Sequence, residues 1–236
     1  MTIFATASRR FDRTGTAAAA QSTVVNTAVL VTVLALAGCG ALPDKPGRIT
    51  AYDFGPGLMG APIAAANIGT GGAVGLPAIA LADIEANARF DGTQMLFRLG
   101  YADANELRPY AQSRWSLAPA QLVRQRLRDA LAARRTVLDP QDSATLARSD
   151  PRPPILRIAL EEFTQYFESP GSSVGLVRLR ATLVQSTPGG DRVVGQRAFT
   201  VRRSAPTADA PGGVKALAAA SEVAVAEVVA WVDQAR

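Results

Sequence analysis

The single cysteine of this 236-residue chain, Cys39, stands in a sequence pattern that predicts lipid attachment. Residues 36–38 read Leu-Ala-Gly, and an aliphatic residue followed by two small residues and a cysteine is the pattern of a lipobox. The small residues let an extended backbone enter the cleft of a signal peptidase. The thiol accepts the diacylglyceryl group before cleavage, so we predict lipidation of Cys39 and cleavage just before it.

The residues before Cys39 predict a lipoprotein signal peptide over residues 1–38. Arg9, Arg10 and Arg13 form a positively charged start, and residues 24–37 are almost wholly apolar. This apolar run is shorter than the roughly 20 residues that a membrane-spanning helix needs, and it has the length of a signal-peptide core. The alternative is a membrane-anchoring helix in which the cysteine is incidental.

Cysteine usage and the residue after Cys39 indicate a location. With one cysteine no intrachain disulfide can form. A free thiol would be a liability in an oxidising compartment, whereas an acylated one is not. Gly40 follows Cys39 where enteric lipoproteins that stay at the inner membrane carry aspartate. We expect a lipid-anchored protein of the outer membrane that faces the periplasm, with the inner membrane as the alternative.

Histidine is absent from the sequence, which removes the commonest general base and the commonest metal ligand. With Cys39 committed to lipid, zinc and copper sites lack their usual donors. Catalysis by a Ser-His-Asp or Cys-His arrangement is excluded. We expect no enzymatic activity, no catalytic residue, no metal and no cofactor.

Three motifs imitate catalytic or nucleotide-binding sites but fail on context. Residues 171–175 match Gly-x-Ser-x-Gly, yet they join two predicted strands and Ser173 has no histidine partner. Glu161 and Glu162 are neighbours on a predicted strand and point to opposite faces, so they cannot flank one bond as paired catalytic carboxylates do. We expect one to face water and the other to mark a bulge. Residues 69–72 (Gly-Thr-Gly-Gly) lack the strand and the Lys-Ser/Thr of a phosphate-binding loop.

The charge of the chain does not favour nucleic acid as a partner. The net charge of +5 is small, and the arginines are scattered rather than clustered. Arginines spread along predicted strands and a helix are typical of a solvated face.

The first half of the folded part predicts three strands and one helix. Asp91 and Gly92 form a strong hairpin dipeptide between the second and third strands. Ser116 can cap the helix, and Pro119 is tolerated in its first turn, where backbone amides lack helical partners. The predicted segments are a strand at 49–54, a flexible Gly/Ala-rich insertion at 55–76, strands at 77–87 and 93–99, a polar segment at 101–115 and a helix at 117–135.

The second half predicts the same order again. Apolar and polar residues alternate in three successive strands near 156–161, 177–183 and 193–203, and the short connections make these neighbours antiparallel. A helix follows over 210–234 with Asp209 as its N-cap.

These elements predict an α+β fold in the order βββα-βββα. We expect a two-layer sandwich of a largely antiparallel sheet with two amphipathic helices. Residues 49–236 would form a single domain, joined to the lipid by a short tether at 39–48 that contains proline and glycine.

The polar segment before the first helix holds candidates for partner contact. Tyr101, Arg108 and Tyr110 lie there, and tyrosine and arginine are enriched among interface hot spots. Binding residues also concentrate in loops. Trp115 stands next to the predicted N-cap, so we expect it to pack beneath the helix start, with a partner contact as the alternative.

Taken together, the sequence resembles the ABC-type transport auxiliary lipoprotein family, which includes paraquat-inducible protein C and lipoproteins encoded beside Mce-type lipid transporters. The resemblance covers nearly all of the chain after Cys39 except the Gly/Ala-rich insertion, and residues 101–127 are its most specific part. It rests on the lipobox and on the blocks YDFGP (52–56), TQMLFRLGY (93–101), NELRPYAQSRWSLAPAQLVRQRL (105–127), LRIALEEFTQYF (156–167) and GGVKALAAASEVAVAEVVAWV (212–232).

The resemblance implies a non-enzymatic component that works with an ABC permease, an ATPase and an Mce-domain protein to move lipids or other hydrophobic molecules across the envelope. It leaves a homo-oligomer open. An alternative from another class is a carrier lipoprotein that itself holds an acyl chain between sheet and helices. Such a carrier would need an underfilled core lined by Leu, Phe and Val.

Overall fold

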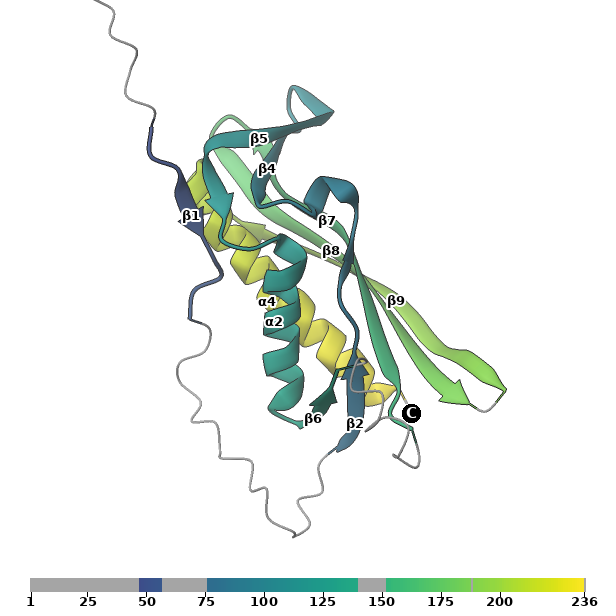
Figure 1. The fold of residues 1–236 in the computed structure, drawn as a ribbon. Helices are drawn as coiled ribbons and strands as arrows, with labels where there is room; N and C mark the ends of the chain where they lie inside the picture. Colours follow the sequence, from purple (N-terminus) through teal and green to yellow (C-terminus); the bar gives the residue numbers. More distant parts are fainter. Residues whose placement is uncertain (1–46, 57–75, 140–151, 188, 236) are drawn as a thin grey trace, which may run out of the picture. The chain divides into compact units, whose positions relative to one another are not determined.

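The structure is a computed structural model, and it describes residues 47–56, 76–139, 152–187 and 189–235 (Figure 1). The predicted signal peptide, Cys39, most of the tether, residues 69–72 and most of the insertion at 55–76 lie outside the described residues. By its internal contacts, Arg48–Arg236 forms one compact unit.

Three long antiparallel strands form one side of the sheet, as the alternating pattern predicts. Strand β7 (Ile155–Ser169) pairs with β8 (Ser172–Thr187), and β8 pairs with β9 (Gly190–Ser204). Tight turns join both pairs, which fixes their register locally. The β7–β8 register shifts between Leu160 and Glu162, so the predicted bulge lies at the Glu161–Glu162 pair.

The opposite edge of β7 carries three short strands in tandem. Strands β2 (Leu76–Leu81), β3 (Glu85–Ala86) and β4 (Gln94–Leu99) each run parallel to β7 and pair with successive parts of it. The predicted hairpin at Asp91 and Gly92 is therefore wrong. A 3₁₀ turn at Ala88–Phe90, capped by Asn87, lies between β3 and β4 and buries Phe90. After this turn β4 runs in the same direction as β3, so the two strands do not form a hairpin.

The expectation of a largely antiparallel sheet is also wrong. The described strands form one mixed nine-stranded sheet in which most of the pairings between strands are parallel, although the longest ladders are antiparallel. Short connections suggested that successive strands would be neighbours. In the fold, β2, β3 and β4 instead pair with β7, which lies far away in sequence. The local sequence of a strand does not indicate such a distant pairing. The α+β class with two helices is confirmed.

The segment predicted as a polar loop forms a strand. After a turn at residues 100–102, β5 (Asp103–Trp115) returns antiparallel to β4, and the register shifts at two places along the pair. Strand β1 (Thr50–Tyr52) runs parallel to the end of β5, and β6 (Arg135–Leu138) runs parallel to β2. Most β5 side chains are exposed, which explains why its composition is that of a loop.

The two helices pack against each other, and α4 covers the inner face of β7, β8 and β9 (Figure 1). Helix α2 (Pro119–Ala132) begins after Ala118, so the predicted cap at Ser116 is wrong, whereas the position of Pro119 in the first turn is confirmed. Helix α4 (Ala210–Gln234) has the predicted cap, because Asp209 accepts a bond from the Gly212 N–H. Bonds from the Thr207 hydroxyl and this N–H hold the pKa of Asp209 below its usual value.

The core lies between the sheet and the helices. Helix α4 approaches β8 so closely that a Cβ on Gly175 would lie 2.5 Å from the carbonyl carbon of Ala216, which only glycine avoids. The largest fully buried side chains among the described residues are Phe90, Phe163, Ile79, Leu81, Met95, Leu127, Leu131, Leu156, Ile158, Leu160, Leu179 and Leu217.

Neither of the described helices combines the length and the apolar character that a membrane-spanning helix requires.

Candidate partner-contact site

The three predicted contact residues lie on the β4–β5 hairpin but in different environments. Tyr101, in the turn, has 47% of its surface exposed. Arg108 is exposed on β5 and forms an ion pair with Glu106. The hydrogen bond from the Arg108 guanidinium lowers the pKa of the Glu106 carboxyl. Tyr101 and Arg108 are thus available to a partner.

Tyr110 differs, because its side chain is half-buried and faces the fold. Its ring lies 4.6 Å from that of Phe97, and its hydroxyl donates to Gln165 Oε1 at 2.8 Å. Burial raises the pKa of Tyr110 to about 12, with a smaller contribution from the negative charge of Asp209. Tyr110 therefore holds the hairpin in place from inside.

Gln165 is the centre of a buried polar network that sequence reasoning missed. It is fully buried on β7, and its Nε2 donates to Ser173 Oγ at 2.8 Å and to the Asp209 carbonyl at 3.1 Å. The network thus ties β5, β7, β8 and the start of α4 together. The signal that could have revealed it is the alternation of the strand, which places Gln165 on the same face as the apolar Phe163 and Phe167, since buried polar groups need partners.

Ser173 lies where the hairpin interpretation of its motif predicts. It is the second residue of β8 after a tight turn from β7, is 3% exposed, and its hydroxyl accepts the bond from Gln165. A nucleophile elbow requires a strand-to-helix turn that exposes the hydroxyl. The Gly-x-Ser-x-Gly motif at 171–175 is therefore part of a β-hairpin.

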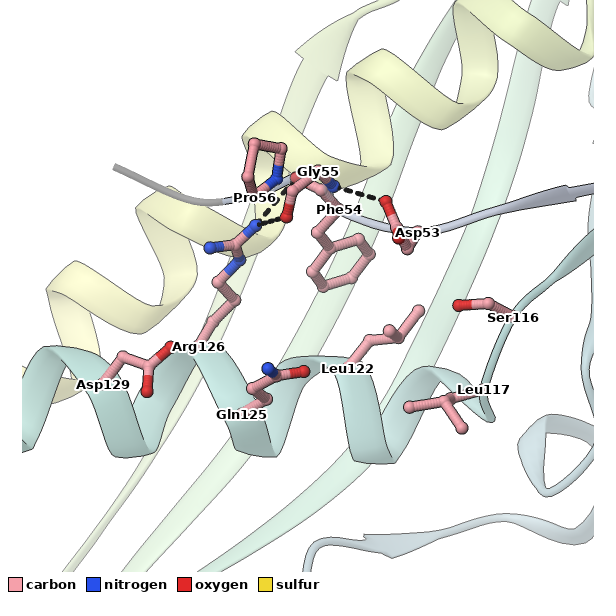
Figure 2. A pocket seen from close by; sticks show the side chains of 10 residues that line it. All are labelled: Asp53, Phe54, Gly55, Pro56, Ser116, Leu117, Leu122, Gln125, Arg126 and Asp129. Atoms are coloured by element: carbon pink, nitrogen blue, oxygen red, sulfur yellow. Dashed lines mark hydrogen bonds between the residues drawn. The ribbon is translucent and has the colours of Figure 1, made fainter. Parts of the chain in front are cut away.

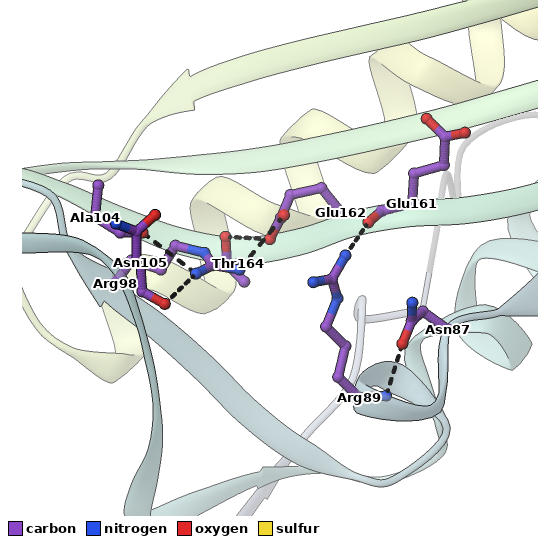
Figure 3. Close-up of polar contacts among 8 residues, drawn as sticks. All are labelled: Asn87, Arg89, Arg98, Ala104, Asn105, Glu161, Glu162 and Thr164. Carbon is purple, nitrogen blue, oxygen red and sulfur yellow. Dashed lines mark hydrogen bonds and ion pairs between the residues drawn. The ribbon is translucent and has the colours of Figure 1, made fainter.

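The open face of the sheet holds paired charges (Figure 3). Glu161 accepts from Arg180 Nε at 2.6 Å, and its backbone carbonyl accepts from Arg89 at 3.2 Å. Glu162 lies 3.7 Å from Arg98 and accepts from the Thr164 hydroxyl at 2.9 Å. The two carboxylates have separate partners on this one face, so the expectation that they point to opposite faces is wrong, because the register shift interrupts the alternation of the strand.

Arg98 is a second residue that sequence reasoning missed. Its guanidinium donates to the backbone carbonyls of Ala104 at 3.3 Å and Asn105 at 3.2 Å (Figure 3). These two residues lie where the register between β4 and β5 shifts. These bonds fix the hairpin that presents Tyr101 and Arg108. An arginine in the middle of an apolar strand was the available signal.

Trp115 is buried, as predicted. It is 2% exposed, and its ring meets Phe54 at 5.7 Å and Phe163 at 5.4 Å in edge-to-face geometry. This aromatic trio joins the segment after β1, the end of β5 and the middle of β7. The indole N–H finds no acceptor among the described residues, so Trp115 acts through packing.

A cleft of about 210 Å³ lies between the segment after β1 and helix α2 (Figure 2). Arg126 reaches across it from α2 and donates to the carbonyl of Phe54 at 2.8 Å and to that of Gly55. The volume is below the 300–1,000 Å³ typical of pockets for small molecules. Its lining is Asp53, Phe54, Gly55, Pro56, Ser116, Leu117, Leu122, Gln125, Arg126 and Asp129.

The described residues contain no group of three or more acidic, cysteine or histidine side chains placed to hold a metal ion.

A family model, described as the ABC-type transport auxiliary lipoprotein component, matches residues 58–229 of the chain. The chain belongs to this family. The resemblance seen in the sequence is thereby confirmed.

Solved structures share the fold of this auxiliary lipoprotein at low sequence identity. The protein XCC0632 from Xanthomonas campestris has a TM-score of 0.57 and 18% identity, over 68% of this chain and 86% of that one. An uncharacterised protein has a TM-score of 0.50 and 11% identity, over 66% and 92%. The comparison with curated proteins gave no match.

The family match begins after the N-terminal segment of the described fold. Strand β1 and Phe54 precede residue 58, so the lipoprotein's aromatic trio and the Arg126 bonds involve residues outside the matched region. This segment connects the predicted tether to the shared fold.

Proposed function

We propose that this auxiliary lipoprotein is anchored through lipid on Cys39 and serves an Mce-type ABC system that moves lipids or other hydrophobic molecules. The observation that carries the proposal is the family match over residues 58–229, joined to a lipobox at Cys39. The absence of histidine from the sequence supports a role without catalysis. The partners would be the Mce-domain protein, the permease and the ATPase of the same system.

The proposed contact surface is the outer side of the β4–β5 hairpin. Tyr101 and Arg108 are exposed there, and Arg98 holds the backbone that carries them. A backbone that is already fixed favours binding through Tyr101 and Arg108, because less conformational entropy is lost when a partner binds. Tyr110 would act as an internal support of this surface.

Pull-down of the Mce-domain protein encoded in the same operon tests the proposal. Tyr101→Ala and Arg108→Ala should each weaken association by about 2 kcal/mol, as expected at a hot spot, while the melting temperature stays that of wild type. Val193→Ala, another exposed residue on a distant strand, is the matched control. No association of the wild-type protein in intact membranes would contradict the proposal.

The lipid anchor has its own test. Cys39→Ser should yield an uncleaved or mislocalised precursor, because the thiol that would accept the lipid before cleavage is missing. The domain should still fold, because folding of residues 49–236 does not require the thiol. Phase partitioning in detergent and fractionation of inner and outer membranes measure the effect. Normal processing and unchanged membrane retention of the variant would contradict lipidation, and wild-type protein in the inner membrane would contradict the proposed outer-membrane location.

Native mass spectrometry separates this function from the carrier alternative. The side chains between sheet and α4 pack closely, with Leu179, Leu217 and Val228 fully buried. We therefore expect the protein's mass to show no bound lipid beyond the covalent anchor. A retained acyl lipid would favour the carrier instead.

A further inference from the structure

Strand β9 presents a long free edge. Among the described residues it pairs with β8 alone, and the register is continuous from Gly195 to Ser204. The irregularity lies before this run, between Leu183 and Val184 of β8. The run contains neither proline nor an acidic residue, and proline is one of the usual devices that stop a further strand from pairing.

The side chains of this run alternate between two faces. Phe199 and Val201 are buried on the face that α4 covers, and their β8 partners Leu179 and Val177 are fully buried. Two arginines flank this apolar pair on the same face by the two-residue period of a strand. They are Arg197, opposite Ala181, and Arg203, opposite Gly175.

Arg197 and Arg203 differ from the arginines of the open face. Arg202 pairs with Glu168 at 2.6 Å, whereas neither Arg197 nor Arg203 forms an ion pair with a described carboxylate. The Arg197 guanidinium lies 5.2 Å from the Phe199 ring, and Arg203 donates to the neighbouring carbonyl of Arg202. Both side chains are exposed, so their charges are available at the edge.

Helix α4 offers apolar surface beneath the same edge. Trp231 meets the Phe199 ring at 6.1 Å and lies below Gly195, where an added Cβ would approach it to 3.3 Å. Trp231 is half-buried. A strand added beside β9 would cover part of the remaining surface.

We propose that the 195–204 run of β9 binds an extended acidic segment of a partner protein as an additional strand. Its inward face should carry an acidic residue, two apolar residues and a second acidic residue at alternate positions, opposite Arg203, Val201, Phe199 and Arg197. Backbone hydrogen bonds supply affinity in this mode, and alternate side chains supply specificity. The unpaired arginines, which discourage other strands, select for the acidic one.

A second copy of this chain would bring further positive charge to an edge that already carries Arg197 and Arg203. Two-fold antiparallel pairing of β9 with itself about Thr200 would place Arg197 opposite Arg203, and like charges directly opposite each other are destabilising. The charge pattern therefore favours a different, acidic chain. This inference does not depend on the Mce system being the partner.

Binding of two labelled peptides to the full lipidated chain in mild detergent tests the proposal. The acidic probe is Thr-Glu-Thr-Val-Thr-Val-Thr-Glu-Thr, and the control probe has lysine in place of both glutamates. We expect the acidic peptide to bind about tenfold or more tightly than the control at low salt. Alternate amides within 195–204 should also exchange hydrogen more slowly when it is bound.

The double variant Arg197→Glu/Arg203→Glu should reverse the preference and bind the lysine peptide instead. Arg192→Glu reverses one arginine charge on the same strand outside the run, and it should keep the preference of wild type. Unchanged affinities in the double variant, or protection that avoids β9, would overturn the proposal. Protection of β9 that grows with protein concentration without peptide would also overturn it, because a second copy would then occupy the edge.

Discussion

The two edges of strand β7 differ in the length and direction of the strands that pair with them. One edge pairs with β8 in an antiparallel ladder that runs along nearly the whole strand and continues into β9. The other edge meets β2, β3 and β4 through two or three parallel residue pairs each. The first side is held mainly by its backbone ladder, so the second must depend on side chains that bridge the short strands.

Three such bridges are visible. The Phe54–Trp115–Phe163 trio joins the segment after β1 and the end of β5 to β7, and Gln165 accepts a hydrogen bond from Tyr110 of β5. Arg126 of α2 holds the segment after β1, which carries Phe54. The hairpin proposed to contact a partner belongs to this side. Its geometry should therefore be more sensitive to single substitutions than that of β8 and β9.

Of the substitutions considered, Trp115→Ala should cause the largest loss of stability, and the loss should be greatest on the side of β7 that carries the short strands. Removing a large buried aromatic costs about 3–5 kcal/mol of unfolding free energy. Amide exchange should quicken first in β1, β4 and β5 and least in the β8–β9 ladder. Urea unfolding with hydrogen exchange measures both.

Trp115→Phe is the control for this substitution. The indole N–H has no described acceptor, so phenylalanine keeps much of the packing and loses no hydrogen bond. It should cost clearly less than alanine. An alanine variant with unchanged melting temperature and weakened partner binding would show instead that Trp115 is a contact residue.

The same contrast explains what the sequence could predict. Strands β7–β9 and α4 have alternating patterns, tight turns and a capping aspartate, all of which are local signals. These elements occur in the predicted order, and α4 has its predicted bounds, whereas β7 and β8 extend well beyond the predicted segments. Parallel pairing of β2, β3 and β4 with β7 joins segments about 70 residues apart and depends on tertiary packing. The sequence of β5 predicts a loop because most of its side chains are polar and face solvent.

The candidate site was predicted in part for similar reasons. Exposed Tyr101 and Arg108 could be selected by residue type, since that argument needs no geometry. The same argument selects Tyr110, but its hydroxyl donates to Gln165, which lies 55 positions further along the chain. Buried networks of this kind appear only when distant strands are brought together.

Gln165→Leu should have the next largest effect, because it breaks the bridge between the two sides. Tyr110, Ser173 and the Asp209 carbonyl would each lose a partner, and leaving buried polar groups unpaired costs about 1–3 kcal/mol. Chemical denaturation measures the loss. Gln196→Leu, on the exposed part of β9, is the matched control and should stay close to wild type. Equal stability of the two variants would contradict the bridging role.

Arg126→Met should have a smaller effect, confined to the segment after β1. The apolar stem is kept while the bonds to the carbonyls of Phe54 and Gly55 are lost, which costs about 1 kcal/mol. Limited proteolysis should cut faster near Pro56 than in wild type. Gln125→Met, an exposed neighbour on α2, should not change the cleavage rate. A global loss of stability without faster local cleavage would argue against a local fastening role.

The smallest expected effect is the response of Tyr110 to alkaline pH. Burial raises the pKa of Tyr110 to about 12 in the folded state, whereas an unfolded tyrosine has a pKa of about 10. The folded state therefore favours the protonated hydroxyl, whose bond to Gln165 is fully present below about pH 10 and is lost as the pH rises toward about 12. Tyr110→Phe lacks this titration, so the stability advantage of wild type over the variant should shrink across that interval. Urea unfolding of both proteins at about pH 9 and about pH 11 measures the difference, and an advantage that stays constant would show that the hydroxyl does not support the hairpin as the geometry implies.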